Sequence, residues 1–281
     1  MKTENILVIG GTGKTGKRIV KLLEAAGQNV RVGSRSAEPP FDWHRPEDWL
    51  KALEGMDKMY ITYQPDLAVP GALESIEQLV KDAKRASIKK LVLLSGKGER
   101  EAQLCEQVII HSGLDYTIVR ASWFNQNFSE NFLLEPILDG FVALPQAEAK
   151  IPWVDADDIA EVAALALLDD KHNGQIYELT GPRTLTFGQA VKEIAAASKR
   201  HIVFVPVTIK EYIEVMRKEG MSGDFVWLIE YLFTEVLGNP ELAETTNDIE
   251  KVLGRKPKDF SVFAQETVKT GVWNPGVSEK V

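Results

Sequence analysis

The chain has 281 residues, a formal net charge of −8 and a single cysteine, Cys105. The negative charge argues against a nucleic-acid partner, because neutralising phosphates requires a basic surface. One cysteine excludes an internal disulfide and favours a reducing, cytoplasmic location. No apolar run approaches the roughly eighteen residues of a membrane-spanning helix, and no basic-then-apolar leader precedes the first predicted strand, so we expect no membrane association.

The N-terminal segment is the most informative part of the chain. Four apolar residues at 6–9 lead into a glycine-rich turn at 10–16, and apolar residues then recur at helical spacing. A strand, a glycine turn and a helix in this order are typical of a dinucleotide-binding unit. The backbone N–H groups at the start of such a helix face phosphates. We therefore predict that this turn, Lys14 included, holds the phosphates of a nucleotide cofactor.

The glycine-rich turn has two other interpretations. Residues 11–17 match part of the phosphate loop of NTP-hydrolysing proteins, but Arg18 stands where a Ser or Thr would hold magnesium. Lys14-Thr15 resembles the other half of that motif, but no glycine lies five residues before Gly13. The remaining alternative is a turn that only joins a strand to a helix.

The second predicted strand, at 29–33, indicates which dinucleotide is bound. NAD-specific sites usually place an Asp or Glu near the end of this strand, for the ribose hydroxyls. Here the strand is followed by Ser34, Arg35 and Ser36. A guanidinium and two hydroxyls suit a 2′-phosphate, so we predict NADP(H) in preference to NAD(H). The alternative is a solvated arginine after a strand.

Strands and helices alternate through the first half of the chain. The predicted strands are 5–10, 29–33, 58–62, 90–95 and 115–119, and the predicted helices are 14–26, 46–54, 70–86 and 99–112. This order predicts an α/β fold with a doubly wound parallel Rossmann sheet covered on both faces. Ligands bind beyond the carboxyl ends of such strands. We therefore expect Tyr63 and Pro65 along the adenosine half of the cofactor, and Ser95, Gly96 and residues 121–124 near the nicotinamide.

The second half of the chain has a different character. We predict helices at 125–139, 155–168, 208–219, 223–237, 246–253 and 260–270, a further helix from 186, and strands at 141–144, 150–154, 175–180 and 201–206. Residues 1–180 then form the Rossmann domain, with 125–150 contributing to the substrate lobe, and 181–281 form a smaller, mainly helical C-terminal lobe. Asp155, Asp157 and Asp158 are assigned to helix capping rather than to a metal, since no His or Cys lies nearby.

The usual proton donor of short-chain reductases is missing. Those enzymes use a tyrosine whose pKa is lowered by a lysine four residues later, and none of the six tyrosines here has a lysine at that spacing. The four histidines lie in no nucleophile motif. The catalytic residues therefore stay unknown, with Ser95 the nearest candidate. Two activities remain: hydride transfer to an acceptor that readily takes electrons, and binding of NADP(H) without turnover.

Several segments resemble the motifs of NmrA-like atypical short-chain dehydrogenases, in the right order. They are residues 10–16, 112–120, 123–128, 154–160 and 177–182. Residues 34–36 and 41–43 are similar to a segment of the fungal clavine-forming iminium reductases. The length and the lobe arrangement resemble those of triphenylmethane-dye and quinone reductases. The family includes both reductases and non-catalytic NADP sensors.

The resemblance implies roles for individual residues. It implies that the pyrophosphate lies at Gly10, Gly13, Thr15 and Gly16. It implies Arg35 at the 2′-phosphate, and Ser95 and Trp123 beside the nicotinamide. Many relatives carry a lysine on the helix after Ser95, where this chain has Ala102-Gln103.

Aromatic residues follow the last site-forming strand and recur in the second half of the chain. The predicted substrate contacts are Trp123, Phe124, Phe128, Trp153 and Trp227. Such rings bind flat or cationic molecules by stacking and cation–π contact, although core packing is the alternative for each of them.

The sequence therefore predicts an NADPH-dependent reductase that transfers hydride directly to a planar conjugated acceptor, such as an iminium, a quinone or a cationic dye. The alternative is a non-catalytic NADP(H) sensor of the NmrA type. A third hypothesis, an epimerase- or lyase-type enzyme with a tightly held cofactor, is disfavoured by the missing tyrosine–lysine pair. We expect a small aromatic or conjugated substrate as partner, and a monomer or a homodimer.

Overall fold

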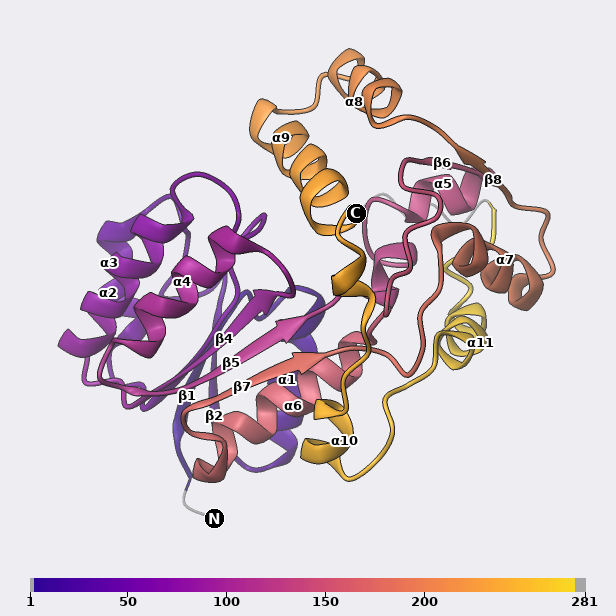
Figure 1. Ribbon diagram of the computed structural model, residues 1–281. Coiled ribbons are helices and arrows are strands. Elements are labelled where there is room, and N and C mark those ends of the chain that lie inside the picture. The colour runs from indigo at the N-terminus through magenta and orange to yellow at the C-terminus, as the bar shows by residue number, and fades with distance from the viewer. Residues whose placement is uncertain (1–2, 276–281) are drawn as a thin grey trace. The chain divides into compact units, whose positions relative to one another are not determined.

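The computed structural model describes residues 3–275, which fold into two compact units (Figure 1). The first unit contains the chain up to Ala121 together with Ala156–Leu179. The second contains Ser122–Asp155 and the chain from Thr180 onward. The segment assigned to the second unit thus runs from residue 122 to 155, whereas the sequence placed 125–150 there.

The first unit is built on a six-stranded sheet with the order β2-β1-β3-β4-β5-β7. Its strands are β1 (Asn5–Ile9), β2 (Asn29–Gly33), β3 (Lys58–Ile61), β4 (Lys90–Gly96), β5 (Asp115–Ala121) and β7 (Gln175–Leu179). Every neighbouring pair is parallel. The chain leaves β1 toward β2 and then crosses back to β3, so the strand order reverses at β1. The predicted doubly wound parallel Rossmann sheet is confirmed.

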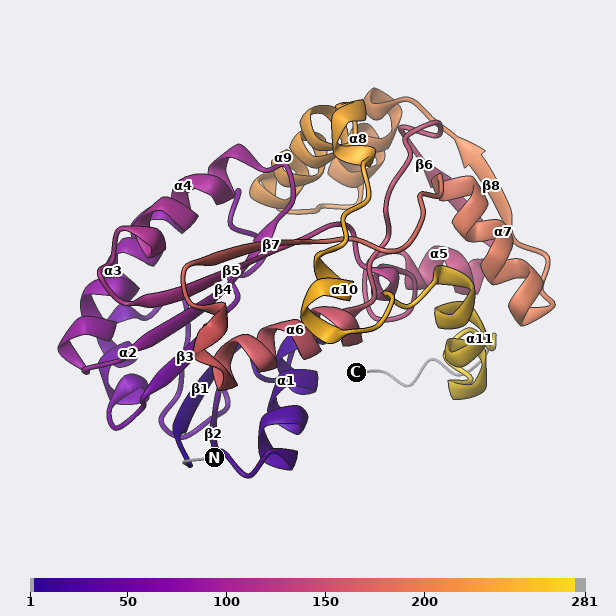
Figure 2. The same ribbon diagram turned by 60° about the horizontal axis from the view of Figure 1, so that its bottom comes forward.

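Helices cover both faces of this sheet, which explains why its central strands are continuously apolar. Helices α1 (Lys14–Ala25) and α6 (Ala156–Leu168) pack against each other on one face. Helices α2 (Pro46–Leu53), α3 (Ala72–Arg85) and α4 (Arg100–Ile110) form a layer on the other face, as Figures 1 and 2 show. The apolar residues of β1 and β3, and Leu91–Leu93 of β4, consequently expose almost no surface.

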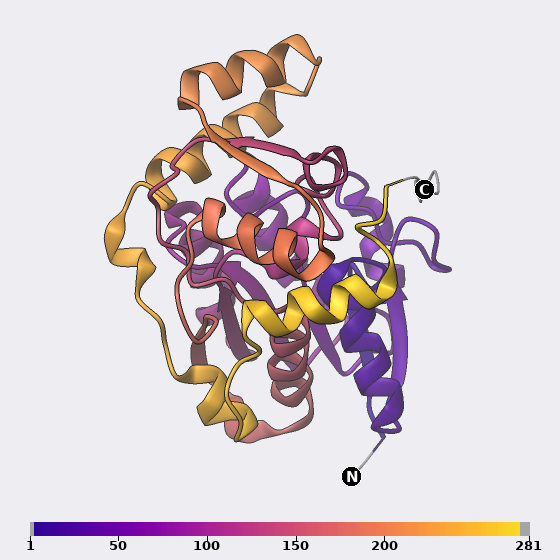
Figure 3. The same cartoon turned by 90° about the vertical axis from the view of Figure 1, so that its right-hand side faces the viewer.

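The second unit is mainly helical. It has one parallel pair of short strands, β6 (Phe141–Leu144) and β8 (Val203–Pro206). Its helices are α5 (Leu134–Asp139), α7 (Phe187–Ser198), α8 (Ile209–Lys218), α9 (Gly223–Tyr231), α10 (Asp248–Leu253) and α11 (Phe260–Thr270). Capping boxes at Thr186 and Thr208 start α7 and α8. Figure 3 shows α7 and α11 lying side by side.

The predicted helix at 125–139 is wrong. The structure has a 3₁₀ turn at Asn125–Phe128 and a separate helix, α5, that begins at Leu134. Pro136 explains the break, because proline lacks an N–H and clashes with the preceding turn inside a helix but is tolerated in its first turn. The predicted strand at 150–154 is also reduced to isolated bridges of Ile151 and Val154.

Among the described residues, no helix combines the length and the apolar character needed to cross a membrane. The same part of the chain has no group of three or more His, Cys, Asp or Glu side chains arranged to hold a metal ion. Asp155, which directly precedes α6, accepts a hydrogen bond from Gln126 Nε2 at 3.1 Å and pairs with Lys258 Nζ at 3.5 Å.

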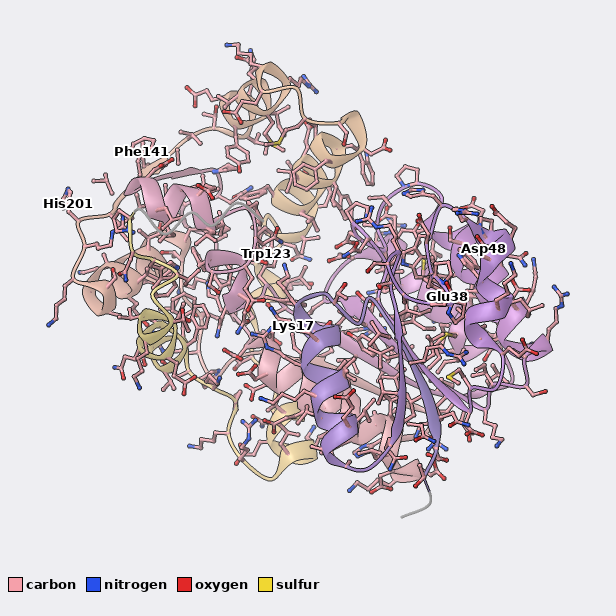
Figure 4. All side chains as sticks on the ribbon, turned by 180° about the vertical axis from the view of Figure 1, so that it is seen from behind. Lys17, Glu38, Asp48, Trp123, Phe141 and His201 are labelled. Carbon is pink, nitrogen blue, oxygen red and sulfur yellow. The ribbon has the colours of Figure 1, made fainter. Side chains whose placement is uncertain are left out.

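The core of the second unit should depend strongly on Phe187, which is fully buried and stacks on Phe233 with a centroid distance of 5.7 Å. We expect Phe187→Ala to lower the free energy of unfolding by about 3–5 kcal/mol, measured by urea denaturation. Phe141→Ala is the matched control, because that ring is 53% exposed at the outer surface of the same unit (Figure 4). Equal losses in both variants would contradict this assignment.

Candidate functional site

The turn between β1 and α1 is shaped by two glycines. Gly10 has a φ of +69°, a left-handed conformation that a side chain would strain, and its N–H donates to Gly33 O at 2.8 Å. Gly16 lies directly against the turn, because a Cβ at this position would sit 2.0 Å from the carbonyl oxygen of Gly10. Only glycine therefore allows the first turn of α1 to approach the end of β1 so closely.

The start of α1 is open to an anion. Gly13 is its N-cap, no side chain caps the helix, and no acidic residue lies in its first turn. The N–H groups of a first helical turn have no acceptor within the helix and carry a partial positive charge. This arrangement matches the pyrophosphate site predicted for Gly10, Gly13, Lys14 and Gly16.

Thr15 faces the protein interior rather than the turn. Its hydroxyl shares a buried hydrogen bond of 2.9 Å with the phenol of Tyr60 on β3. Any contact of Thr15 with a phosphate would therefore come from its backbone N–H. Burial raises the pKa of the Tyr60 phenol, which is the opposite of what a proton-donating tyrosine requires.

The end of β2 carries the residues predicted for the 2′-phosphate. Ser34 and Ser36 have their hydroxyl oxygens 3.3 Å apart, and Arg35 between them is exposed. Within residues 3–275 the guanidinium of Arg35 forms no ion pair with a carboxylate. A charge that has no internal partner remains available to a phosphate.

An aromatic group lies at the ends of β2 and β3, where the adenosine half is expected. The ring of Tyr63 contacts that of Trp43 at 4.5 Å, and Trp43 Nε1 donates to Thr62 O at 3.2 Å. Pro65 follows in the same loop. Trp43 was not predicted as a site residue, although it belongs to the 41–43 segment that resembles the clavine-forming reductases and lies shortly after Arg35.

Ser95 lies near the end of β4 in a buried polar network. The Ser95 hydroxyl donates a hydrogen bond to Glu106 Oε1 at 2.6 Å. The Glu106 carboxylate also accepts hydrogen bonds from Nε and Nη2 of Arg120, and the bond from Nη2 to Oε2 is 2.6 Å long. The Glu106 carboxylate raises the pKa of the Arg120 guanidinium. The single proton of Ser95 is therefore already committed to Glu106, which weakens the case for Ser95 as a general acid. Gly96 is the last residue of the strand.

The predicted substrate residues belong to the second unit and differ in exposure. Phe128 and Trp153 have 0% and 1% of their surface exposed, so they pack the core of that unit and offer no face to a ligand. Trp123 is half-buried and meets Trp153 edge-on at 6.0 Å. Phe124 is half-buried, whereas Trp227 is 40% exposed on α9 and stacks on Tyr231.

A family model described as NAD(P)H-binding matches residues 10–170, more than half of the chain. The chain belongs to this NAD(P)H-binding family. The match begins at the first glycine of the turn described above and extends past the end of α6. The predicted dinucleotide cofactor is confirmed.

Two relatives of this NAD(P)H-binding chain cover nearly its whole length. Prestalk A differentiation protein A of Dictyostelium discoideum is 30% identical over 280 residues, which are 94% of this chain and 92% of that protein. Festuclavine dehydrogenase easG of Aspergillus fumigatus is 28% identical over 287 residues, which cover 93% of this chain and 97% of that protein. The fold is also similar to that of the Citrobacter sp. triphenylmethane reductase complexed with NADP(H), with a TM-score of 0.77, 19% identity and coverage of 94% and 99%.

The Gly16→Ala variant should lose most of its affinity for NADPH, because the added methyl group would overlap the Gly10 carbonyl and push α1 away from the turn. We expect Kd to rise at least about tenfold, a loss of about 1.4 kcal/mol, in a fluorescence titration. Gly223→Ala is the control, since a Cβ there meets nothing within 4 Å. Unchanged affinity in a folded Gly16→Ala protein would refute the site.

Proposed function

We propose that this NAD(P)H-binding chain is an NADPH-dependent oxidoreductase that transfers hydride directly to a planar conjugated acceptor, such as an iminium, a quinone or a cationic dye. The uncapped, glycine-built start of α1 is the observation that carries this proposal, because N–H groups arranged in this way suit the phosphates of the cofactor. The names of the festuclavine dehydrogenase and the triphenylmethane reductase support the class of acceptor.

The preference for NADPH over NADH rests on the end of β2. Ser34 and Arg35 provide a hydroxyl and an exposed guanidinium, and no acidic residue directly follows the strand to bind the ribose hydroxyls. A guanidinium binds a 2′-phosphate more strongly than an unmodified ribose hydroxyl, because the two groups carry opposite charges and can form two parallel hydrogen bonds.

The reaction proposed here needs no strong general acid. Bound NADPH supplies a hydride, and an acceptor that is cationic or quinoid takes it without first being protonated. What the protein must contribute is position and exclusion of water. This fits a chain with no Tyr-x-x-x-Lys sequence, in which burial raises the pKa of Tyr60. We further propose Trp123, Phe124 and Trp227 as the acceptor contacts, through stacking on their rings.

Arg35→Ala should change cofactor preference. Loss of a charge-assisted, forked contact with the 2′-phosphate should raise the Kd for NADPH by roughly ten- to a hundredfold and leave that for NADH nearly unchanged. Calorimetric titration with both cofactors measures this. Arg85→Ala is the control, because this arginine pairs with Asp82 at the far end of α3. Equal effects on both cofactors would mean that Arg35 does not contact the 2′-phosphate.

Turnover tests the proposal directly. The purified chain should oxidise NADPH when given a cyclic iminium, a quinone or a triphenylmethane dye, followed at the absorbance of the reduced cofactor. Gly16→Ala should lower this activity at NADPH concentrations below its raised Kd, because it weakens cofactor binding. Tight NADPH binding without oxidation in the presence of every acceptor would overturn the proposed reaction.

The alternative is a non-catalytic NADP(H) sensor. It is favoured by one observation: the relative that is 30% identical is named for differentiation and not for a reaction. A sensor must bind the oxidised and reduced cofactors unequally, because a ligand with equal affinity for two states shifts no equilibrium. Unequal Kd values for NADP⁺ and NADPH, without turnover, would favour this alternative.

A further inference from the structure

The loop after β2 carries Arg35 and is closed on itself. The N–H groups of Ala37 and Phe41 both donate to Ser34 O, at 3.2 and 2.9 Å. Phe41 is only 3% exposed, so it anchors the far side of the loop in the core of the first unit. Arg35 is exposed and forms no ion pair with a carboxylate within residues 3–275. The direction of its guanidinium therefore depends on how the rest of the loop is held.

Trp43 is the second anchor of this loop, and three aromatic rings pack against it. Its ring meets that of Phe41 edge-on at 5.1 Å and that of Trp49 edge-on at 5.4 Å. Tyr63, from the segment after β3, contacts it at 4.5 Å. Edge contacts of this kind favour one relative orientation of the rings. The neighbouring rings therefore restrict how the indole of Trp43 can turn, which fixes the direction of its N–H group.

The indole N–H connects two parts of the cofactor site. It donates to Thr62 O at 3.2 Å, and Thr62 directly follows β3. The methyl group of Thr62 lies against the glycine turn, because a Cβ at Gly10 would overlap Thr62 Cγ2. The N–H of Gly10 in turn donates to Gly33 O at the end of β2. Trp43 thus ties the loop of Arg35 to the backbone that borders the phosphate turn.

We propose that Trp43 is a positioning residue for the 2′-phosphate of NADPH: its N–H bond to Thr62 holds the loop after β2 in the conformation that directs Arg35 at that phosphate. This inference rests on the contact of Arg35 with the 2′-phosphate in the proposed function. A forked guanidinium–phosphate contact requires a defined orientation. A loop that is held in place before the cofactor arrives loses less conformational freedom on binding, which increases affinity.

The same ring has a second conceivable role, since it lies where the adenosine half is expected. An indole that stacked on the adenine would bind NADPH and NADH equally well, because the base is the same in both. Such a role would depend on the ring and not on its N–H. The two roles therefore differ in which cofactor they affect and in which part of Trp43 they use.

Trp43→Phe tests the positioning role, because phenylalanine keeps an aromatic ring and removes the N–H. We expect the Kd for NADPH to rise roughly three- to tenfold, the size of one neutral hydrogen bond, and the Kd for NADH to stay within about twofold in a calorimetric titration. NADH uses the same glycine turn, so its unchanged affinity also reports that the variant is folded. Trp273→Phe is the matched control: it removes an indole N–H from a backbone carbonyl, Phe128 O, in the second unit, and should change neither Kd.

A second replacement keeps the packing of the ring intact. Benzothiophene in place of the Trp43 indole has the same two-ring shape and carries sulfur where the N–H stands. It should weaken NADPH binding as much as Trp43→Phe does. Full retention of NADPH affinity with benzothiophene would show that the N–H is dispensable and would overturn the proposal. Equal losses for NADPH and NADH would assign the ring to the adenine and overturn it as well.

A double-mutant cycle shows whether Trp43 acts through Arg35. In the Arg35→Ala protein, Trp43→Phe should change the Kd for NADPH no further, because the group that it positions is absent. Additive losses would mean that the two residues act independently, which contradicts the positioning role.

The single variants separate this inference from the proposed function. If Arg35→Ala weakens NADPH selectively and Trp43→Phe does not, the proposed cofactor preference holds and the role of Trp43 is wrong. If Arg35→Ala affects NADPH and NADH equally, the contact with the 2′-phosphate is wrong and the role of Trp43 is wrong with it.

Discussion

The close approach of Gly16 to the carbonyl of Gly10 is the contact on which the rest of the first unit depends. With 2.0 Å between that oxygen and the place where a Cβ would stand, α1 can begin only where no side chain intervenes. The contact aims the first N–H groups of α1 across the end of β1. It also turns Thr15 inward onto Tyr60 and leaves the surface of the turn to the backbone. The backbone N–H groups that would bind a phosphate therefore have a direction that the fold sets.

Two buried glutamates near the end of β4 illustrate how neighbours determine what a side chain can do. Glu106 lies between the Ser95 hydroxyl and the Arg120 guanidinium, where a cation offsets its charge. Glu99 lies near Asp66 instead, and burial, followed by the charge of that second carboxyl, raises the pKa of Glu99. The two residues are seven positions apart in the sequence and identical in type. Their different neighbours make Glu106 part of an ion pair and raise the pKa of Glu99.

The aromatic residues of the second unit serve mostly to hold that unit together. Trp153 and Phe187 are 5.4 Å apart and nearly perpendicular, an arrangement that buries large rings with favourable edge contacts. Phe128 belongs to the same core, and its carbonyl accepts the indole N–H of Trp273 at 2.8 Å. An aromatic ring between two predicted elements can pack in the core or contact a ligand. The residue type is the same in both cases, so the sequence does not distinguish the two roles. Trp227 differs because it lies exposed on α9.

The sequence by itself determined the strand–turn–helix at 10–16, the alternating elements of the parallel sheet and the residues that follow β2, because local spacing and backbone preference decide these features. It failed at 125–139, where Pro136 is tolerated only in the first turn of a helix and α5 therefore begins at Leu134, although that signal was present in the sequence. Tertiary structure alone decided which rings are core. The sequence had assigned 125–150 to the second lobe, and the structure extends that segment to 122–155. It also brought Asp66 to Glu99, thirty-three positions away in the sequence. Such pairings depend on which strands lie side by side, and no local pattern records that.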